Sequence, residues 1–402
     1  MLKLVPSRQL KAENLKINSI FLLFLITNAL LIQSCNDQKG EIRLLKQEDF
    51  DTIINGKKVE LFTLTNTSGT TCQITNYGAR WLSMWVQDKT GKMTDVVLGF
   101  NTLREYMSAG EPYHGAIVGR ICARIDDARF TLHGNEYKLA ENDLFGVPVK
   151  NHLHGGIMGF HRQVWDAKTF ENEKKEQGVI FSYLSVDGEE GFPGNLGVEV
   201  KYLLTENNEL KIEYLAVTDK PTLVNMTNHA YFNLNGEGNG NILDHQMKVN
   251  SEKYIETDAE LIPTGLLKTV EGTPLDYRNF ASMGKGIDED HDQIIKGKGY
   301  AAAMVIKEEN NNDLNEVAIA YSEDSGIQMQ VFSTKTSLQL YNAWLMDGAD
   351  TGKSGKLYGA SAGFVMEPQG FPDAPNHKNF PSVVLRPEEK YIHTDIYKFS
   401  VR

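Results

Sequence analysis

The sequence contains little cysteine and no excess of positive charge. Its 402 residues include three cysteines, Cys35, Cys72 and Cys122, which are too few for the disulfide framework of a small secreted domain. Lysine and arginine number 41 against 53 aspartates and glutamates, which gives a formal net charge of −12. This balance provides no basic stripe for phosphate groups, so we expect no nucleic acid partner.

The common motifs for nucleotide, zinc and serine chemistry are also missing. The sequence has no glycine-rich dinucleotide fingerprint, no His-Glu-x-x-His helix and no serine elbow. Residues 348–354 resemble a phosphate loop, but three residues separate the glycines where the motif requires four, and we interpret them as a solvated turn. His152 and His154 would share one face of a strand, yet no further ligand stands beside them. We expect no required cofactor and no structural metal, while an incidental calcium ion among the surface acids stays open.

The first 34 residues are predicted to be a targeting segment. Four basic residues precede a mostly apolar run over residues 17–32, and the chain then reads Ile-Gln-Ser-Cys up to Cys35. This order resembles a bacterial lipoprotein signal, in which cleavage leaves the cysteine as the N-terminus and its thiol carries lipid. An uncleaved signal anchor is the alternative, but the polar residues after Cys35 favour the lipoprotein. We predict a signal peptide over residues 1–34, a tether over residues 35–45 and one domain over residues 46–402.

The predicted lipid at Cys35 determines the expected location of the protein. It would be exported and anchored to a bacterial membrane, facing the periplasm or the cell surface, with no other membrane contact. A disulfide between Cys72 and Cys122 is chemically permitted there. Two cysteines form no framework pattern and buried thiols are common, so we expect both to be free.

Alternation of apolar and polar residues with a period of two dominates the predicted domain. Three pairs of alternating segments flank short polar turns and predict hairpins: residues 198–204 with 210–216, 130–132 with 137–139, and 327–331 with 338–341. Long amphipathic helices are missing, and only short pieces such as residues 103–109 look helical. Many strands without alternating helices predict an all-β fold, a large antiparallel β-sandwich with one face left to bind a ligand.

Three short segments concentrate polar side chains where a sandwich strand should be apolar. They cover residues 151–156, 227–234 and 367–376. Glu367 directly follows the apolar residues 363–366, which places its carboxylate at the end of a buried strand. Burying a carboxylate costs several kcal/mol unless it is partnered or neutralised. A single histidine in such a segment is more often a satisfied core residue, but histidines, a carboxylate and tight turns together favour a functional site.

These segments resemble the aldose 1-epimerases, or galactose mutarotases. The most specific parts are residues 227–234, which read Thr-Asn-His-Ala-Tyr-Phe-Asn-Leu, and residues 367–376, which read Glu-Pro-Gln-Gly-Phe-Pro-Asp-Ala-Pro-Asn. Supporting matches are residues 76–79, 118–120, 124–125, 151–156, 159–160, 165 and 339–342. The resemblance implies a galactose mutarotase-like sandwich and an enzyme that interconverts the α and β anomers of an aldohexose such as glucose or galactose.

The resemblance also implies the acid and the base of this reaction. Anomer exchange opens the hemiacetal, turns the C1–C2 bond and recloses the ring, so one group removes the C1 hydroxyl proton while another donates to the ring oxygen. Glu367 would be the base and His229 the acid, on opposite sides of one sugar ring. Such chemistry requires a carboxylate whose pKa is raised by burial and a histidine that titrates near neutrality.

Four further residues are implied to bind the sugar. His154 would hydrogen-bond at the ring-oxygen side, and Arg124 would donate to hydroxyls through its planar guanidinium. Tyr231 and Gln339 would line the pocket and hold the remaining hydroxyls. The implied partner is a monosaccharide, and we expect a monomer.

Two positions depart from the family pattern. Ala123 replaces a common asparagine, and Ala301 replaces an aspartate that accepts hydrogen bonds from substrate hydroxyls. Asp290 or Asp292 could take over the second role. Two other functions stay open: a non-catalytic or weakened carbohydrate-binding sandwich, and a glycoside-processing enzyme, which would require a second catalytic carboxylate at a defined distance from Glu367.

Restoring the aspartate tests the placement of Ala301. We expect Ala301→Asp to improve affinity for galactose or glucose by about one to two decades, because a hydrogen bond to a charged group contributes about 1.5–3 kcal/mol. Polarimetric KM values for the two proteins provide the measurement. Unchanged or lowered activity would show that the segment does not correspond to the family motif.

Overall fold

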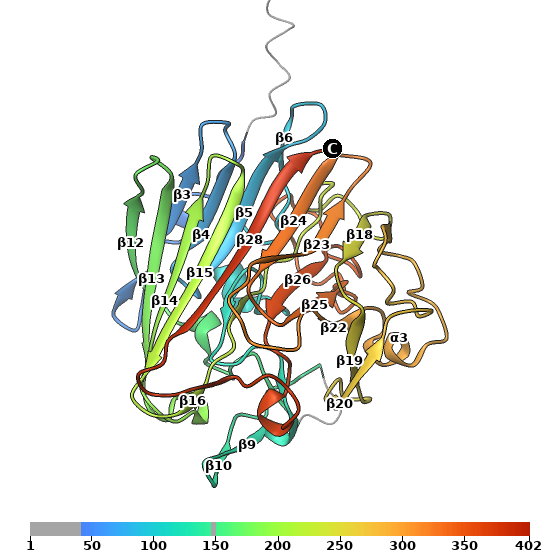
Figure 1. Ribbon diagram of the computed structural model, residues 1–402. Helices are drawn as coiled ribbons and strands as arrows, with labels where there is room; N and C mark the ends of the chain where they lie inside the picture. Colours follow the sequence, from blue (N-terminus) through green and yellow to red (C-terminus); the bar gives the residue numbers. More distant parts are fainter. Residues whose placement is uncertain (1–41, 146–149) are drawn as a thin grey trace, which may run out of the picture.

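A nine-stranded antiparallel sheet forms the largest layer of the protein, as Figure 1 shows for the computed structural model. The structure describes residues 42–145 and 150–402. The predicted signal peptide, its lipid attachment at Cys35 and most of the tether lie outside the described residues. No helix within those two ranges is long and apolar enough to span a membrane.

The large sheet combines strands from the middle and the end of the chain. In spatial order its strands are β12 (Asp166–Glu171), β13 (Gln177–Ser185), β14 (Leu196–Leu204), β15 (Glu209–Thr218), β28 (Tyr391–Val401), β24 (Ile327–Ser333), β23 (Asn315–Tyr321), β18 (Gln246–Val249) and β21 (Ala281–Ser282). The C-terminal strand β28 lies between β15 and β24 and so joins the two halves of the sheet.

Two smaller sheets cover one face of the large sheet. The five-stranded sheet has the order β20 (Pro263–Thr269), β19 (Lys253–Thr257), β22 (Ala301–Val305), β25 (Ser337–Tyr341) and β26 (Val365–Gln369). The four-stranded sheet has the order β3 (Leu61–Thr65), β4 (Thr71–Thr75), β5 (Arg80–Gln87) and β6 (Met93–Asp95). The predicted all-β antiparallel sandwich is therefore confirmed.

Short ladders and helices complete the described part of the chain. The two-stranded ladders are β1 (Ile53–Ile54) with β2 (Lys57–Lys58), β7 (Ile117–Val118) with β17 (Thr227–Asn228), β8 (Arg124–Ile125) with β11 (His152–Leu153), β9 (Arg129–Leu132) with β10 (Asn135–Lys138), and β16 (Thr222–Leu223) with β27 (Val384–Leu385). The α-helices are α2 (Leu103–Ser108) and α3 (Asp292–Gly297). Two of these ladders, β7/β17 and β8/β11, include residues of the motifs quoted above.

The main core lies between the large sheet and the two smaller ones. Trp81 of β5 occupies its centre and contacts Phe232, Tyr397 and Phe399 edge-on, with ring centroids 5.3, 5.4 and 6.4 Å away. Edge-to-face contact of this kind adds to the free energy gained by burying aromatic surface. The aromatic residues of β5 and β28 therefore hold the sheets together.

One ion pair is fully buried in this core. The Lys335 ammonium lies 2.8 Å from Asp395 of β28, donates to the Met226 carbonyl at 2.7 Å and lies 3.9 Å from the centre of the Tyr214 ring. A buried charge of this kind requires a partner, because removing it from water costs several kcal/mol. Lys335 thereby links the large sheet to the chain segment that enters β17.

The strand pairing confirms two of the three predicted hairpins. β14 pairs with β15, with Val200 opposite Tyr214, and β9 pairs with β10. The third hairpin is wrong, because β24 pairs with β23 and β28 while β25 pairs with β22 and β26. The turn between β24 and β25 carries Lys335 into the core, and the chain passes there from one sheet to another. Alternation identifies the buried face of a strand but not its partner.

Several smaller predictions have clear outcomes. The helix predicted over residues 103–109 is α2, which begins with a capping box between Thr102 and Glu105. Cys72 and Cys122 are free and buried, as expected. Residues 348–354 form turns and no helix, and Ala349, Thr351 and Ser354 are exposed, as expected for a solvated turn, although the Lys353 side chain is largely buried and pairs with Asp95 at 2.6 Å.

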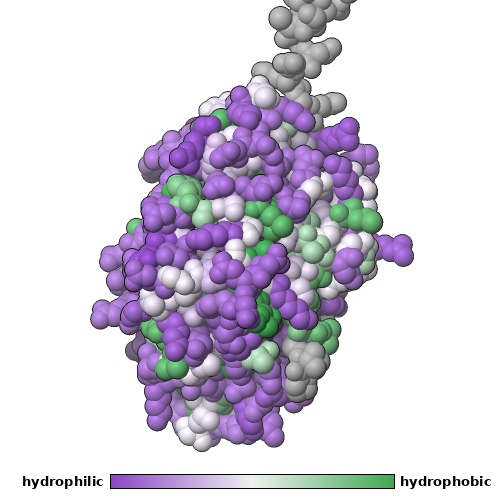
Figure 2. Space-filling view, turned by 90° about the vertical axis from the view of Figure 1, so that its right-hand side faces the viewer, coloured by the Kyte–Doolittle hydropathy of each residue, from purple (hydrophilic) through white to green (hydrophobic). Residues whose placement is uncertain are grey.

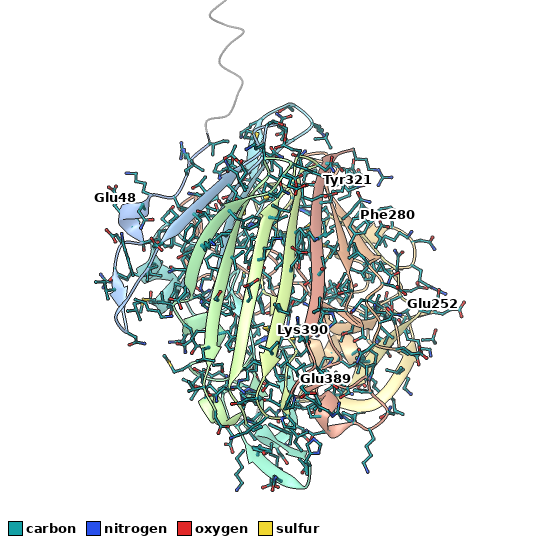
Figure 3. All side chains as sticks on the ribbon, turned by 60° about the vertical axis from the view of Figure 1, so that its left-hand side comes forward. Glu48, Glu252, Phe280, Tyr321, Glu389 and Lys390 are labelled. Carbon is teal, nitrogen blue, oxygen red and sulfur yellow. The ribbon has the colours of Figure 1, made fainter. Side chains whose placement is uncertain are left out.

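The face of the molecule that carries α3 and β20 is mostly hydrophilic. Figure 2 shows the side that carries α3 and β20, where apolar surface is confined to small patches. The last residue of the chain contacts two aromatic rings: the Arg402 guanidinium lies 5.0 Å from the Phe280 ring centre and 4.9 Å from that of Tyr321, and Figure 3 labels both aromatic residues. Cation–π contacts of this kind help to order the terminal residue.

Candidate active site

Glu367 and His229 come from two strands that lie next to each other. Glu367 is the central residue of β26, all of whose residues are buried, and it pairs with Gln339 of β25. Pro368 follows without loss of a sheet hydrogen bond, since β26 is an edge strand. His229 comes directly after β17, and its backbone exchanges hydrogen bonds of 2.8 Å with Gly115 and Ala116. Both side chains therefore project from backbone that is firmly held.

The two side chains contact each other directly. His229 Nε2 lies 3.0 Å from Glu367 Oε1, and the side chains are only 6% and 3% exposed. The sequence predicted that they would face each other across a sugar ring, but they lie side by side on one wall. This arrangement still allows both to reach a sugar, because the C1 hydroxyl oxygen and the ring oxygen of a pyranose are bonded to the same carbon.

Burial dominates the electrostatics of the pair. It raises the pKa of Glu367 well above its usual range, and the negative charge of Glu111 adds to this, while the Lys335 ammonium acts in the opposite sense. Burial lowers the pKa of His229 to about 3. The expectation that His229 titrates near neutrality is therefore wrong, because the imidazole is too poorly hydrated to hold a charge at neutral pH. The 3.0 Å contact is a hydrogen bond between neutral forms rather than an ion pair.

All six residues predicted for the site line one cavity of about 90 Å³. Besides Glu367 and His229, these are Arg124, His154, Tyr231 and Gln339. The aromatic rings of the wall pack around the imidazole of His229, with centroid distances of 5.0 Å to His154, 5.1 Å to Tyr231 and 5.7 Å to Tyr113. The cavity thus combines a buried acid–base pair with hydrogen-bonding groups and flat rings.

Arg124 is oriented by a residue that the sequence analysis did not identify. Its Nε donates to Asp143 Oδ2 at 2.6 Å, and its terminal nitrogen donates to Asp143 Oδ1 at 3.4 Å. The Asp143 carboxylate is almost fully buried, whereas the guanidinium is 17% exposed. A two-point contact of this kind fixes the plane of the guanidinium. Nothing in the local sequence around Asp143 indicates this long-range role.

The Gly-Gly turn places His154. The chain leaves β11 in a left-handed conformation, with φ of 51° at His154 and 84° at Gly155. A Cβ atom at Gly155 would lie 1.7 Å from the Gly119 carbonyl oxygen, so only glycine fits there. The His154 Nδ1 accepts a hydrogen bond from the Ala123 amide at 3.2 Å, which leaves the opposite ring edge on the cavity side.

The two neighbouring histidines, His152 and His154, point in different directions. His152 turns away from the cavity, with Nδ1 3.0 Å from the Ala140 carbonyl and its ring against Phe192. It therefore does not share a face with His154, contrary to the strand model. Among residues 42–145 and 150–402, no three His, Cys, Asp or Glu side chains group together as metal ligands.

Ala123 and Ala301 both line the cavity, as the sequence comparison predicted for these positions. The suggested replacements for the missing carboxylate do not. Within the described lining neither Asp290 nor Asp292 occurs, and Asp292 pairs with Lys296 at 2.5 Å on the outside of α3. The lining instead includes Glu111, which was not predicted because no motif surrounds it.

The lowered pKa of His229 gives a direct test by NMR. At about pH 5 an ordinary imidazole is almost fully protonated, whereas we expect the His229 ring to stay neutral because its folded-state pKa is about 3. Histidine side-chain spectra recorded from neutral to acid pH, assigned by comparison with His229→Gln, provide the measurement. Since the unfolded chain takes up this proton below about pH 6.5, the stability that His229 contributes is lost as the pH falls through that window. A His229 signal that titrates near 6.5 would contradict this expectation.

Comparison with known proteins places the chain among relatives of one kind. The family model described as aldose 1-epimerase matches residues 60–398. The chain is 40% identical to the galactose mutarotase of Rattus norvegicus over 328 residues, which cover 82% of this chain and 90% of the relative. It is 34% identical to the aldose 1-epimerase of Escherichia coli K12 over 347 residues, which cover 86% and 96%.

Solved structures agree with this assignment. An aldose epimerase homologue from C. elegans has a TM-score of 0.75 and 29% identity, covering 85% of this chain and 99% of that structure. Galactose 1-epimerase from Lactobacillus acidophilus also has a TM-score of 0.75, with 26% identity and coverage of 87% and 97%. The chain belongs to the aldose 1-epimerase family.

Proposed function

We propose that the protein is an aldose 1-epimerase, an isomerase that interconverts the α and β anomers of hexoses such as glucose and galactose. The observation that carries the proposal is the direct contact of Glu367 with His229 inside a cavity lined by hydrogen-bonding groups. The matched family and the relatives named galactose mutarotase and aldose 1-epimerase support the same activity. No cofactor is required, since ring opening needs only the transfer of two protons.

Glu367 and His229 perform the reaction with a single shared proton. In the free pair the shared proton lies on Glu367. When the cyclic sugar is bound, this proton moves to His229 along the 3.0 Å contact, so that Glu367 becomes the carboxylate and His229 the imidazolium. Glu367 takes the proton of the C1 hydroxyl while His229 donates one to the ring oxygen, and the C1–O5 bond breaks to leave an aldehyde. The pair is then a carboxylic acid beside a neutral imidazole. After rotation about C1–C2, the reverse transfers close the ring on the other face of the aldehyde.

Burial assists this cycle at its most difficult stage. The low-dielectric surroundings raise the pKa of Glu367 and lower that of His229, so they favour the neutral arrangement. The neutral arrangement is the one that accompanies the open-chain aldehyde. The protein therefore stabilises the ring-opened sugar relative to the cyclic one, and no proton has to be exchanged with solvent during turnover.

Arg124, His154, Tyr231 and Gln339 bind the sugar in this proposal. The guanidinium of Arg124, held by Asp143, donates to ring hydroxyls. His154 hydrogen-bonds at the ring-oxygen side, and Tyr231 and Gln339 line the remaining wall. A purely binding sandwich is not favoured, because the chain retains both proton-transfer groups in contact with each other.

Removal of either proton-transfer group tests the activity. We expect Glu367→Gln and His229→Gln each to lower the enzymatic mutarotation rate by about 10²- to 10⁴-fold, the usual contribution of a general acid or base. The optical rotation of freshly dissolved α-glucose or α-galactose, followed with and without protein, provides the measurement. Glu389→Gln, an exposed carboxylate labelled in Figure 3, is the matched control and should be fully active.

Two results would contradict the proposed activity. Tight sugar binding with unchanged decay of optical rotation would indicate a binding module. New reducing ends released from an oligosaccharide would indicate a glycoside-processing enzyme.

We also propose that the protein is an exported lipoprotein that acts as a monomer tethered to a bacterial membrane. The support for the anchor comes from the sequence alone: a basic start, an apolar run and a small residue directly before Cys35. The net negative charge agrees with a body held away from an anionic membrane surface.

Substitution of the lipid-bearing cysteine tests the anchor. We expect the full chain expressed in a bacterium to partition into the detergent phase on Triton X-114 extraction, and Cys35→Ser to remain in the aqueous phase. Cys72→Ala, which removes a buried free thiol, is the matched control and should behave like the parent. Mass spectrometry of the N-terminal peptide identifies the lipid. A parent protein that stays aqueous and carries no lipid would refute the anchor.

A further inference from the structure

Glu111 lies where the catalytic cavity meets a second cavity of about 190 Å³. The residues common to both linings are Glu111, Phe145, Tyr231, Tyr341 and Leu345. Glu111 belongs to the loop that leads into β7, and thus to a different part of the chain from Glu367. It was not among the predicted site residues, and the reaction described above does not use it.

Glu111 supplies one of two carboxylates in the catalytic cavity. Among the described residues that line this cavity, the other is Glu367, which carries protons. Ala123 and Ala301 contribute only methyl groups to the wall. A hexose presents hydroxyl donors on every side, so a pocket for it requires acceptors, and Glu111 is the strongest acceptor of the wall apart from Glu367.

The hydrogen bonds of Glu111 within the protein leave acceptor capacity unused. Its carboxylate accepts from the Tyr113 amide at 3.2 Å and from the Tyr231 hydroxyl. In the described part of the chain no Lys, Arg or His nitrogen lies within ion-pair distance of it. A carboxylate offers about four lone-pair directions, so about two remain for donors from the cavity.

Because Glu111 is partly buried, leaving these lone pairs of its carboxylate without a hydrogen-bond donor costs free energy when no ligand is bound. Burial raises the pKa of Glu111 to about 7, despite the two hydrogen bonds, which act to lower it. The more distant Arg80 charge also acts to lower this pKa, but it forms no ion pair with Glu111. A desolvated carboxylate without an ion-pair partner gains more from an added donor than a hydrated one does. A sugar hydroxyl is a donor of the required kind.

Tyr231 connects Glu111 with the reacting groups. The Tyr231 ring lies 5.1 Å from the His229 ring, and its hydroxyl donates to Glu111. Glu111 is also close enough to raise the pKa of Glu367 by its charge. A hexose in contact with Glu367 and His229 therefore extends toward Glu111.

We propose that Glu111 is a substrate-binding residue whose carboxylate accepts a hydrogen bond from a ring hydroxyl of the aldose other than the hydroxyl at C1. This assignment rests on the proposed epimerase function and deepens it. Glu111 provides, from the loop before β7, the acceptor that the alanine at position 301 cannot provide from β22. The hydroxyl that it contacts is then a determinant of which aldose is preferred.

Monodeoxy sugars identify such a contact. The parent protein, Glu111→Ala and Glu111→Gln are compared on galactose and glucose and on their 2-, 3-, 4- and 6-deoxy derivatives, with kcat and KM measured by polarimetry. For the parent we expect one deoxy position to lower kcat/KM about 10- to 100-fold, the range for a hydrogen bond to a charged acceptor. For Glu111→Ala we expect kcat/KM for the complete sugar to fall by the same factor. Removal of that hydroxyl should then lower kcat/KM no further.

Two controls separate this contact from a structural effect. Asp347→Asn alters a carboxylate that lines the second cavity but not the catalytic one. For each deoxy sugar, it should leave the ratio of its kcat/KM to that of the complete sugar as in the parent. Glu111→Gln preserves the shape of the side chain and the fold, and it should show a weaker version of the alanine result. A general loss of protein stability would lower kcat/KM equally for all sugars, and it would not abolish the effect of removing one hydroxyl.

The outcomes distinguish this assignment from the epimerase function itself. Each deoxy sugar has a certain kcat/KM relative to the complete sugar. If Glu111→Ala leaves all of these ratios as they are in the parent, Glu111 does not bind a hydroxyl, although the enzyme is an epimerase. If the parent does not accelerate mutarotation, the proposed function fails. Calorimetry can then compare the affinities of the complete and deoxy sugars for the parent and for Glu111→Ala. An effect of one hydroxyl that Glu111→Ala abolishes still supports the contact, and an effect that Glu111→Ala leaves unchanged overturns it.

Discussion

The burial of one carboxylate against one imidazole is the constraint on which the rest of this structure depends. Neither group is fully charged at low cost inside the sandwich, so each compensates for the desolvation of the other through the 3.0 Å contact. The surroundings adjust this balance with charges farther away. The Lys335 ammonium, held by Asp395 in the core, favours the ionised form of Glu367, and Glu111 opposes it. A proton shared in this way can move between the two groups at small cost.

The fold provides the rigidity that such a contact requires. Glu367 lies on a sheet strand and His229 directly follows a short ladder, so their backbones are fixed by hydrogen bonds that the reaction does not disturb. Lys335 donates to the carbonyl of Met226, three residues before His229, and so ties this ladder to the large sheet. The proposed binding groups around this centre come from strands as well as loops: Arg124 lies on β8 and Gln339 on β25, while His154 and Tyr231 lie on loops. A site held by strands keeps its geometry more precisely than one held by loops alone.

The sequence predicted the fold class and six residues that line one cavity, and it missed what depends on long-range geometry. Alternation in β14 and β15 gave their pairing, because their turn is local. The same signal failed for β24 and β25, whose partners are distant in sequence. The six predicted site residues line one cavity because short motifs carry them. The lowered pKa of His229 and the contribution of Glu111 follow from packing between segments far apart, which no local pattern records.

The alanines at positions 123 and 301 show how a site can change while its chemistry stays intact. Ala123 has φ of 58°, a left-handed conformation that asparagine adopts more readily than alanine. The acceptor missing from β22 is offset by Glu111 on another segment, which keeps a second carboxylate in the cavity. The number of such carboxylates is limited, because each additional negative charge raises the pKa of Glu367 further and makes it a poorer proton donor. Hydroxyl binding and proton transfer are thus coupled through charge. Moving an acceptor carboxylate from one segment to another changes the pKa of Glu367 less than adding a further carboxylate to the cavity.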